Sequence, residues 1–262
     1  MRVENFYAKK EANSKISMVT CYDYSSARIL SNTSIDCLLV GDSLAMTMHG
    51  FKDTLSTTLE MMVLHTAAVK RGANNKFIVS DLPFLSYRKS LSNSVSSVQH
   101  LICAGANAVK LEGASGNLKL IKHLVDSGIP VMGHIGLTPQ HVLKMGYKVQ
   151  GRTQESRQQI QDEALLLQEA GCFALVLECI PSQLAKEITE QVSIATIGIG
   201  AGPHPNGQVL VFQDLLGLNI DFTPSFVKKF TDGEQHIKDG VNSYIQSINR
   251  GEFPLHEDHC CA

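Results

Sequence analysis

The sequence predicts a closed (β/α)8 barrel, and three observations lead to this fold class. Short apolar runs recur along the chain, and each ends in polar or small residues. Helical patterns separate most of these runs, and strands that alternate with helices form a parallel sheet covered by those helices. About seven or eight such units in 262 residues are typical of a closed barrel. A doubly wound open sheet is the alternative architecture for the same alternation.

The predicted strands are the apolar runs themselves. Seven of them are ISMVTCYD (16–23), CLLVGDS (37–43), FIVSDLP (77–83), AVKLEG (108–113), PVMGHIG (130–136), ALVLEC (174–179) and ATIGIG (195–200). An eighth strand is expected near GQVLVFQDLLG (207–217). The strings CAGANAVKLEG and EAGCFALVLEC share an Ala-Gly pair, a short gap and an apolar strand that ends in glutamate.

Helix signals fill the segments between the strands. STTLEMMVLHTAAVKRGA carries a capping box formed by Thr57 and Glu60, and it stops at Gly72. The patterns NLKLIKHLVDSG and SRQQIQDEALLLQEAG end on Gly128 and Gly171, where we expect left-handed C-caps. The strings FVKKF and HIKDGVNSYIQSI, beyond about residue 221, predict C-terminal helices. We expect residues 1–262 to form one barrel domain that includes these helices.

Composition argues against several classes of protein. The formal net charge of -2 gives no electrostatic footprint for nucleic acid. The N-terminal MRVENFYAKKEANSK lacks the apolar stretch of a signal peptide, and no later run is long and apolar enough to cross a bilayer. We therefore expect no membrane partner.

The cysteines predict a reduced, cytoplasmic protein. The seven cysteines include no C-x-x-C pair, so neither a zinc knuckle nor a redox motif is indicated. Cys260 and Cys261 lie near His256 and His259, a set that suits a metal, but a disordered tail is the favoured interpretation.

Ionisable residues stand at the predicted strand ends. The C-terminal strand ends of such a barrel carry the chemistry, so these side chains should meet at one mouth. They are Asp42, Asp81, Lys110, Glu112, His134 and Glu178. Asp42 and Asp81 could instead be helix N-caps, and His134 a hydrogen-bonded barrel histidine.

The string VKLE raises a separate question of orientation. Side chains on a strand alternate between faces, so Lys110 and Glu112 share one face while Val109 and Leu111 share the other. On a surface strand the charged pair would simply be solvated. We interpret the charged face as pointing into the barrel mouth, because four carboxylates at one mouth require counter-cations.

A divalent metal is the natural counter-cation for those carboxylates. Like charges held close in a low dielectric cannot all ionise, and Lys110 balances one of them. Carboxylate oxygens without a Cys or His cluster favour a hard ion, Mg2+ first. Mg2+ leaves coordination positions for an oxygen-bearing substrate, and an α-keto acid can chelate it through its carboxylate and keto oxygens.

Nine strings, in order along nearly the whole chain, resemble the ketopantoate hydroxymethyltransferase family. They are VTCYDYSSA, LLVGDSLAM, HTAAVKRGA, DLPFLSY, AGANAVKLEG, GHIGLTPQ, GYKVQGR, LVLECIP and IGIGAG. The resemblance implies a barrel of the phosphoenolpyruvate/pyruvate type. It also implies transfer of a hydroxymethyl group from 5,10-methylenetetrahydrofolate to 3-methyl-2-oxobutanoate, giving 2-dehydropantoate, the first committed step toward pantothenate. One Mg2+ per subunit and a homo-oligomer, a ring-like decamer, are expected from the same resemblance.

The resemblance also implies a role for individual residues. Asp42 and Asp81 would bind both metal and substrate, Ser43 and Lys110 the keto acid, Glu112 the metal, and Glu178 would accept the proton. The chain departs from the common family pattern at other positions, namely Ala45, Ala114 and Asn206.

Two other functions remain open at this point. One is a different metal-dependent 2-oxo-acid lyase on the same type of barrel, which cleaves a C–C bond without folate. The other is a non-catalytic barrel that serves as a binding or assembly module. The intact set of candidate residues argues against the second, because decayed sites usually lose a ligand.

Overall fold

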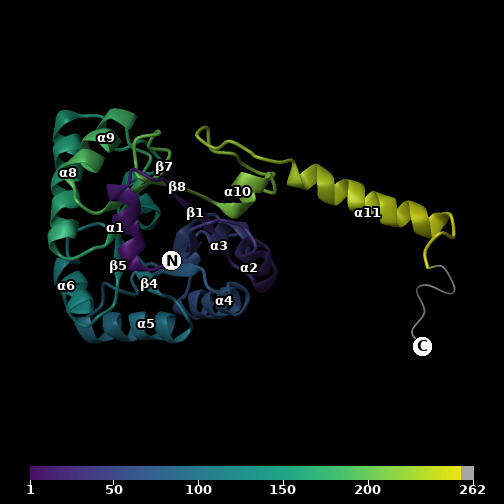
Figure 1. The fold of residues 1–262 in the computed structure, drawn as a ribbon, viewed down its shortest axis with the longest axis horizontal. Helices are drawn as coiled ribbons and strands as arrows, with labels where there is room; N and C mark the ends of the chain where they lie inside the picture. Colours follow the sequence, from purple (N-terminus) through teal and green to yellow (C-terminus); the bar gives the residue numbers. More distant parts are fainter. Residues whose placement is uncertain (255–262) are drawn as a thin grey trace. The chain divides into compact units, whose positions relative to one another are not determined.

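Eight parallel strands close into a barrel in chain order, as the sequence predicts and in contrast to the open-sheet alternative (Figure 1). The computed structural model describes residues 1–254. The strands are β1 (Ile16–Thr20), β2 (Cys37–Val40), β3 (Phe77–Asp81), β4 (Ala108–Glu112), β5 (Val131–Gly136), β6 (Ala174–Glu178), β7 (Ala195–Ile199) and β8 (Gly207–Leu210). The barrel closes where β8 pairs with β1, with Gly207 opposite Ile16.

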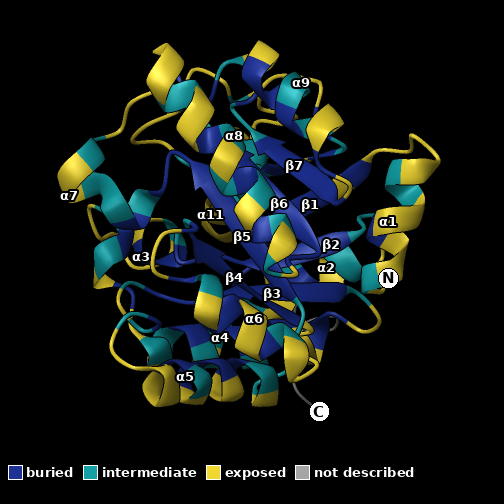
Figure 2. Ribbon diagram, turned by 90° about the vertical axis from the view of Figure 1, so that its left-hand side faces the viewer, coloured by how far each residue is buried: buried dark blue, intermediate teal, exposed yellow. Residues whose placement is uncertain are grey.

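Helices surround the strands, and their outer faces are exposed while the strands are buried (Figure 2). The helices within residues 1–211 are α1 (Val3–Glu11), α2 (Tyr24–Ser31), α3 (Leu44–Thr47), α4 (Leu59–Gly72), α5 (Leu91–Cys103), α6 (Leu118–Asp126), α7 (Val142–Met145), α8 (Gln154–Glu169) and α9 (Ser182–Gln191). Two 3-10 turns, η1 (Thr54–Ser56) and η2 (Pro139–His141), belong to loops that follow β2 and β5. These loops are at the C-terminal strand ends, where the candidate residues lie.

The predicted C-caps are confirmed, whereas the predicted capping box is wrong by one residue. Gly128 and Gly171 have φ of 82° and 98°, the left-handed conformation that glycine adopts without steric cost. Helix α4 is capped by Thr58, whose side chain accepts from the Met61 amide. Thr57 is unavailable as a cap because its hydroxyl donates to the Asp42 carbonyl oxygen at 2.8 Å.

A second compact unit begins at Phe212, and the barrel unit spans Met1–Val211. The expectation that residues 1–262 form one domain stays a prediction. The expected eighth strand occupies only the start of 207–217, because helix α10 (Phe212–Leu216) follows it. Helix α11 (Gly233–Asn249) confirms the helix predicted from HIKDGVNSYIQSI.

The helix predicted from FVKKF is absent from its described residues 226–230. Two backbone amides of this string form hydrogen bonds that an α-helix would not: the Val227 amide donates to the Pro224 carbonyl in a turn, and the Phe230 amide donates to the Leu215 carbonyl. Proline also disfavours helical geometry in the residue before it, here Thr223.

Two expectations about the wider chain are also addressed by the structure. In residues 1–254, no helix combines the length and the apolarity that a membrane crossing needs. The described cysteines, which are Cys21, Cys37, Cys103, Cys172 and Cys179, are all free thiols. The suggested metal set of His256, His259, Cys260 and Cys261 lies outside the described residues.

Helix α1 covers the N-terminal strand ends of the barrel. Phe6 is fully buried and packs edge-on against Phe77 and Phe173, with ring centroids 5.5 and 5.0 Å away. Phe77 begins β3 and Phe173 immediately precedes β6, so this aromatic cluster fills the end of the barrel opposite to the candidate residues.

We predict that Phe6→Ala lowers the free energy of unfolding by about 3–5 kcal/mol, because it leaves a cavity beside the two remaining aromatic rings, Phe77 and Phe173. Urea denaturation of the two proteins measures this difference. Tyr7→Ala is the matched control, since Tyr7 is on the same helix but is 37% exposed. Equal losses in the two variants would show that the aromatic cluster does not stabilise the barrel.

Candidate active site

The parallel register brings the candidate residues from neighbouring strands side by side. Asp81 is opposite Lys110, and Glu112 is opposite His134. Glu178 ends β6 opposite Gly136 of β5. Because these positions are at or near the C-terminal ends of their strands, the ionisable side chains gather at one barrel mouth.

The charged face of β4 points into that mouth. Lys110 and Glu112 are only 5% and 1% exposed, so the solvated-strand alternative is wrong. The Lys110 Nζ lies 3.0 Å from Asp81 Oδ1 and 3.3 Å from His134 Nδ1. Burial alone would lower the pKa of Lys110, but the charges of Asp81, Glu112 and Asp42 outweigh burial and raise that pKa.

His134 lies between two glutamates. Its Nδ1 is 3.5 Å from Glu112 Oε1, and its Nε2 is 3.1 Å from Glu178 Oε2. Burial and the Lys110 charge lower the pKa of His134, while hydrogen bonds to Glu112 and Glu178 outweigh them and raise it to about 9. This shift of the pKa favours the protonated imidazole, which lies between the two carboxylates. The same contacts hold the pKa of Glu112 below its ordinary value against the effect of burial.

The two aspartates lie beside each other, and neither side chain caps a helix. Asp81 Oδ2 accepts from the Asp42 amide at 3.1 Å, and helices α3 and α5 begin after Ser43 and Ser90. Burial and the charges of Asp81 and Glu112 raise the pKa of Asp42 well above its ordinary value. Burial also raises the pKa of Asp81, although Lys110 opposes that shift.

Ser43 follows Asp42 and is half-buried at the same mouth. Its Oγ lies 2.8 Å from the hydroxyl oxygen of Tyr22, which is in the loop after β1. Burial raises the pKa of Tyr22 to about 12, so this phenol stays protonated at neutral pH. Tyr22 thus fixes the orientation of Ser43.

The sequence analysis missed two buried residues at the mouth, Gln140 and Tyr87. The Gln140 side chain donates to Asp42 Oδ2 at 2.8 Å, and the Tyr87 hydroxyl donates to Gln140 Oε1 at 2.8 Å. Both strings that carry them, GHIGLTPQ and DLPFLSY, are part of the family resemblance. Gln140 lies in the short 3-10 turn η2 and Tyr87 in the loop after β3, and neither segment is long enough for a repeating pattern to indicate the direction of a side chain.

The donor set of the two aspartates fits a divalent cation. Burial beside each other raises the pKa of both carboxyl groups, and a cation would stabilise their ionised forms. Mg2+ commonly takes one or two carboxylates together with water. In the described part of the chain, no three His, Cys, Asp or Glu side chains are arranged as a ready metal cluster. Glu112 is engaged by His134 and by the Gln140 amide at 3.0 Å, so its role as a ligand stays a prediction.

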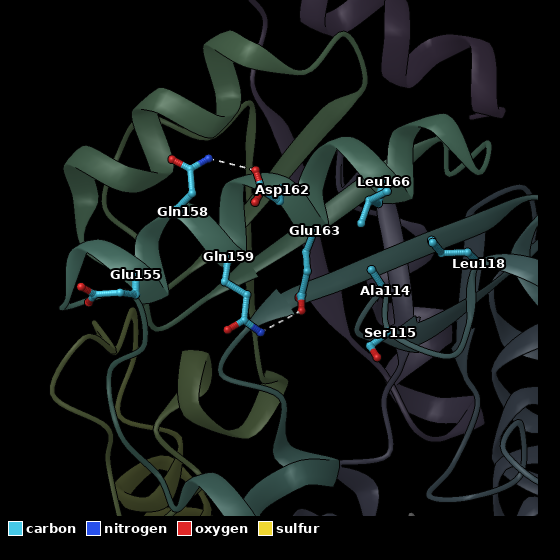
Figure 3. Close-up of a pocket in the computed structure, with 9 residues that line it drawn as sticks. All are labelled: Ala114, Ser115, Leu118, Glu155, Gln158, Gln159, Asp162, Glu163 and Leu166. Atoms are coloured by element: carbon cyan, nitrogen blue, oxygen red, sulfur yellow. Dashed lines mark hydrogen bonds between the residues drawn. The ribbon is translucent and has the colours of Figure 1, made fainter.

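A separate cavity of about 540 Å3 lies on the outside of the barrel, between α8 and the loop before α6 (Figure 3). Its polar side chains pair along α8: Gln158 donates to Asp162, and Gln159 donates to Glu163. None of the predicted site residues lines it.

Comparison with known proteins decides the family. A family profile described as ketopantoate hydroxymethyltransferase matches residues 1–256. The chain belongs to the ketopantoate hydroxymethyltransferase family. Similar curated relatives are the 3-methyl-2-oxobutanoate hydroxymethyltransferases of Francisella tularensis (54% identical), Bdellovibrio bacteriovorus (56%) and Coxiella burnetii (53%). These matches cover 97–99% of this chain and 96–98% of each relative.

Solved structures with little sequence identity share the barrel of this family. A phosphoenolpyruvate phosphomutase from Streptomyces platensis has a TM-score of 0.64 at 12% identity, covering 100% of this chain and 92% of that one. A 2,3-dimethylmalate lyase of the PEP mutase/isocitrate lyase superfamily has a TM-score of 0.59 at 13% identity, covering 98% and 91%. The predicted (β/α)8 barrel is thereby confirmed.

We predict that Lys110→Met lowers the free energy of unfolding by about 3–5 kcal/mol, because it leaves the buried Asp81 without its cation. Urea denaturation in metal-free buffer measures the loss. Lys186→Met is the control, since its ion pair with Glu190 is 3.9 Å long and exposed. Such surface pairs contribute about 0–1 kcal/mol. A Lys110→Met variant as stable as the control would contradict the electrostatic role of Lys110.

Proposed function

We propose that this chain transfers a hydroxymethyl group from 5,10-methylenetetrahydrofolate to 3-methyl-2-oxobutanoate, giving 2-dehydropantoate in the first step of pantothenate biosynthesis. Family membership over residues 1–256 carries this conclusion. The mouth of the barrel supports it chemically, since it pairs buried cations with carboxylates beside a more exposed glutamate. That combination suits the formation of an enolate from a 2-oxo acid.

Binding of the keto acid is the first requirement of this chemistry. We assign it to Asp42, Ser43, Asp81 and Lys110, which lie around the ends of β2, β3 and β4. Lys110 stays cationic because its pKa is raised, so it can attract the substrate carboxylate and stabilise negative charge on the keto oxygen. The Ser43 hydroxyl, oriented by Tyr22, is a neutral hydrogen-bonding group for the same substrate.

The same carboxylates would hold Mg2+, one ion per subunit. We assign it to Asp42 and Asp81, with Glu112 as the third predicted contributor. When bound, Mg2+ acts as a Lewis acid that polarises a carbonyl and supports a developing oxyanion.

Glu178 is the group we assign to removal of the C3 proton. Its side chain is 18% exposed, whereas those of Asp81, Lys110 and Glu112 are 1–6% exposed, so Glu178 is the carboxylate open to an entering substrate. His134 holds its Oε2 and so fixes the direction of the carboxylate. Glu178 takes the proton, and the C–H electron pair forms the enolate. The enolate carbon bonds to the one-carbon unit of the folate, both C–N bonds of that unit break, and one water supplies the hydroxyl oxygen. The two folate nitrogens take up the proton from Glu178 and one proton from the water, which releases tetrahydrofolate.

We also propose a cytoplasmic location and a homo-oligomer, with the decamer of the family as the expected form. The free described cysteines support a reduced compartment. Helix α11 supports self-association, because Ile237, Val241, Tyr244, Ile245 and Ile248 are exposed apolar side chains along it.

A 2-oxo-acid lyase is the nearest competing function, since a lyase shares the same barrel. The donor separates the two reactions: only the transferase consumes 5,10-methylenetetrahydrofolate together with the keto acid. Purified protein should therefore form 2-dehydropantoate only when the folate is supplied. Cleavage of a C4-hydroxylated 2-oxo acid without any dependence on folate would favour the lyase.

We predict that Glu178→Gln retains keto-acid binding but lowers turnover by about 10²–10⁴-fold, the usual contribution of a general base. Calorimetry with 3-methyl-2-oxobutanoate and Mg2+ measures binding, and product formation measures turnover. Glu187→Gln is the matched control, because Glu187 is on the exterior helix α9 and pairs with Arg157. Wild-type turnover in Glu178→Gln would remove Glu178 as the base.

We predict that Asp81→Asn weakens the binding of Mg2+ and of the keto acid together, because one residue serves both. Calorimetric titration of each ligand measures the two affinities. Asp36→Asn is the control. Asp36 immediately precedes β2, at the end of the barrel opposite to Asp81, and it forms an ion pair with Lys9. Unchanged Mg2+ affinity in Asp81→Asn would show that the metal assignment is wrong.

A further inference from the structure

Gln140 connects two of the buried carboxylates through its own hydrogen bonds. It belongs to η2, in the loop after β5, and is only 4% exposed. Its side-chain nitrogen donates to Asp42 Oδ2 at 2.8 Å, and its backbone amide donates to Glu112 Oε2 at 3.0 Å. Gln140 therefore holds one carboxylate oxygen of Asp42, which follows β2, and one carboxylate oxygen of Glu112, which is on β4.

The surrounding groups determine which way the Gln140 amide points. Its Nε2 lies 2.9 Å from the Leu82 carbonyl oxygen, which can only accept a hydrogen bond. The Gln140 Nε2 must therefore face the Leu82 carbonyl oxygen with one N–H, and its second N–H donates to Asp42. The oxygen of the amide then accepts from Tyr87, whose hydroxyl can donate. A flipped amide would place its single oxygen against two acceptor oxygens, Asp42 Oδ2 and the Leu82 carbonyl oxygen.

Tyr87 completes a closed set of hydrogen bonds around Gln140. The Tyr87 hydroxyl oxygen lies 3.4 Å from the Glu112 amide nitrogen, so Tyr87 contacts the same strand that Gln140 does. Each polar group of the Gln140 side chain is thus engaged, and the amide has one orientation. This rigidity fixes the plane of the Asp42 carboxylate that Gln140 contacts.

We propose that Gln140 is a positioning residue, which orients Asp42 and Glu112 for a divalent cation and the keto acid. This inference rests on the proposed function, because it concerns the carboxylates assigned there to the metal. A donor is required at this position: glutamate has nearly the same shape, but it would present an oxygen to Asp42. Partners that orient metal ligands in this way commonly change metal affinity or activity by about 10- to 100-fold.

Mn2+ is a suitable probe, because electron paramagnetic resonance counts the free ion directly during a titration of the full chain. We expect Gln140→Glu and Gln140→Met to weaken Mn2+ binding by about 10- to 100-fold. Tyr87→Phe removes a single hydroxyl and should weaken it less, in the same direction. Gln183→Glu is the matched control, since the Gln183 amide also donates to a carboxylate, Glu187, but on an exposed helix.

Steady-state kinetics adds a readout that a general loss of stability would not produce. At a temperature where thermal unfolding shows Gln140→Met to be fully folded without metal, saturating Mn2+ should restore much of its kcat, because the loss lies in metal affinity and not in the folded fraction. Thermal unfolding confirms that each variant is folded, and Tyr87→Phe keeps the proposal testable if Gln140→Glu does not fold.

The outcomes separate this proposal from the proposed function. Wild-type Mn2+ affinity in folded Gln140→Met and Tyr87→Phe overturns the positioning role while the metal site stands. A wild-type protein that binds no Mn2+, even with 3-methyl-2-oxobutanoate present, overturns the metal assignment itself and the inference with it.

Discussion

The ion pair between Lys110 and Asp81 is the interaction on which the mouth of the barrel depends. Four carboxylates gather there, and three of them are almost inaccessible to water. Burying such charges costs several kcal/mol per ion unless each has a partner of opposite sign. Lys110 and His134 supply part of that positive charge from neighbouring strands. The excess negative charge is the physical basis on which we propose a divalent cation and a substrate that shares it.

The closed parallel sheet provides the geometry for this arrangement. Adjacent strands place Lys110 beside Asp81 and His134 beside Glu112, so their relative positions are determined by backbone pairing. Loops then add groups that the strands do not carry: Ser43 after β2, Tyr87 after β3 and Gln140 after β5. Apart from Asp42, which follows β2, the charged residues are on strands, and the loops orient them.

The sequence predicts those parts that depend on a repeating pattern. Strand alternation indicated that Lys110 and Glu112 share a face, and glycine chemistry located the ends of α6 and α8. The local pattern predicted the wrong N-cap for α4, because a tertiary contact competes for the Thr57 hydroxyl. Thr57 donates to the Asp42 carbonyl oxygen, and Thr58 caps the helix instead. No sequence pattern indicates Gln140, because its hydrogen bonds to Asp42 and Tyr87 join three loops that meet only in the folded barrel.

Proton exchange at C3 of 3-methyl-2-oxobutanoate tests the central claim most directly. Proton NMR in deuterated water, with the wild-type protein and no folate, follows the C3 signal with and without Mg2+. Our account predicts that the signal disappears when protein and Mg2+ are both present, because the mouth alone forms the enolate. A C3 signal that persists with Mg2+, and also after tetrahydrofolate is added, would contradict an enolate-forming site at these strand ends.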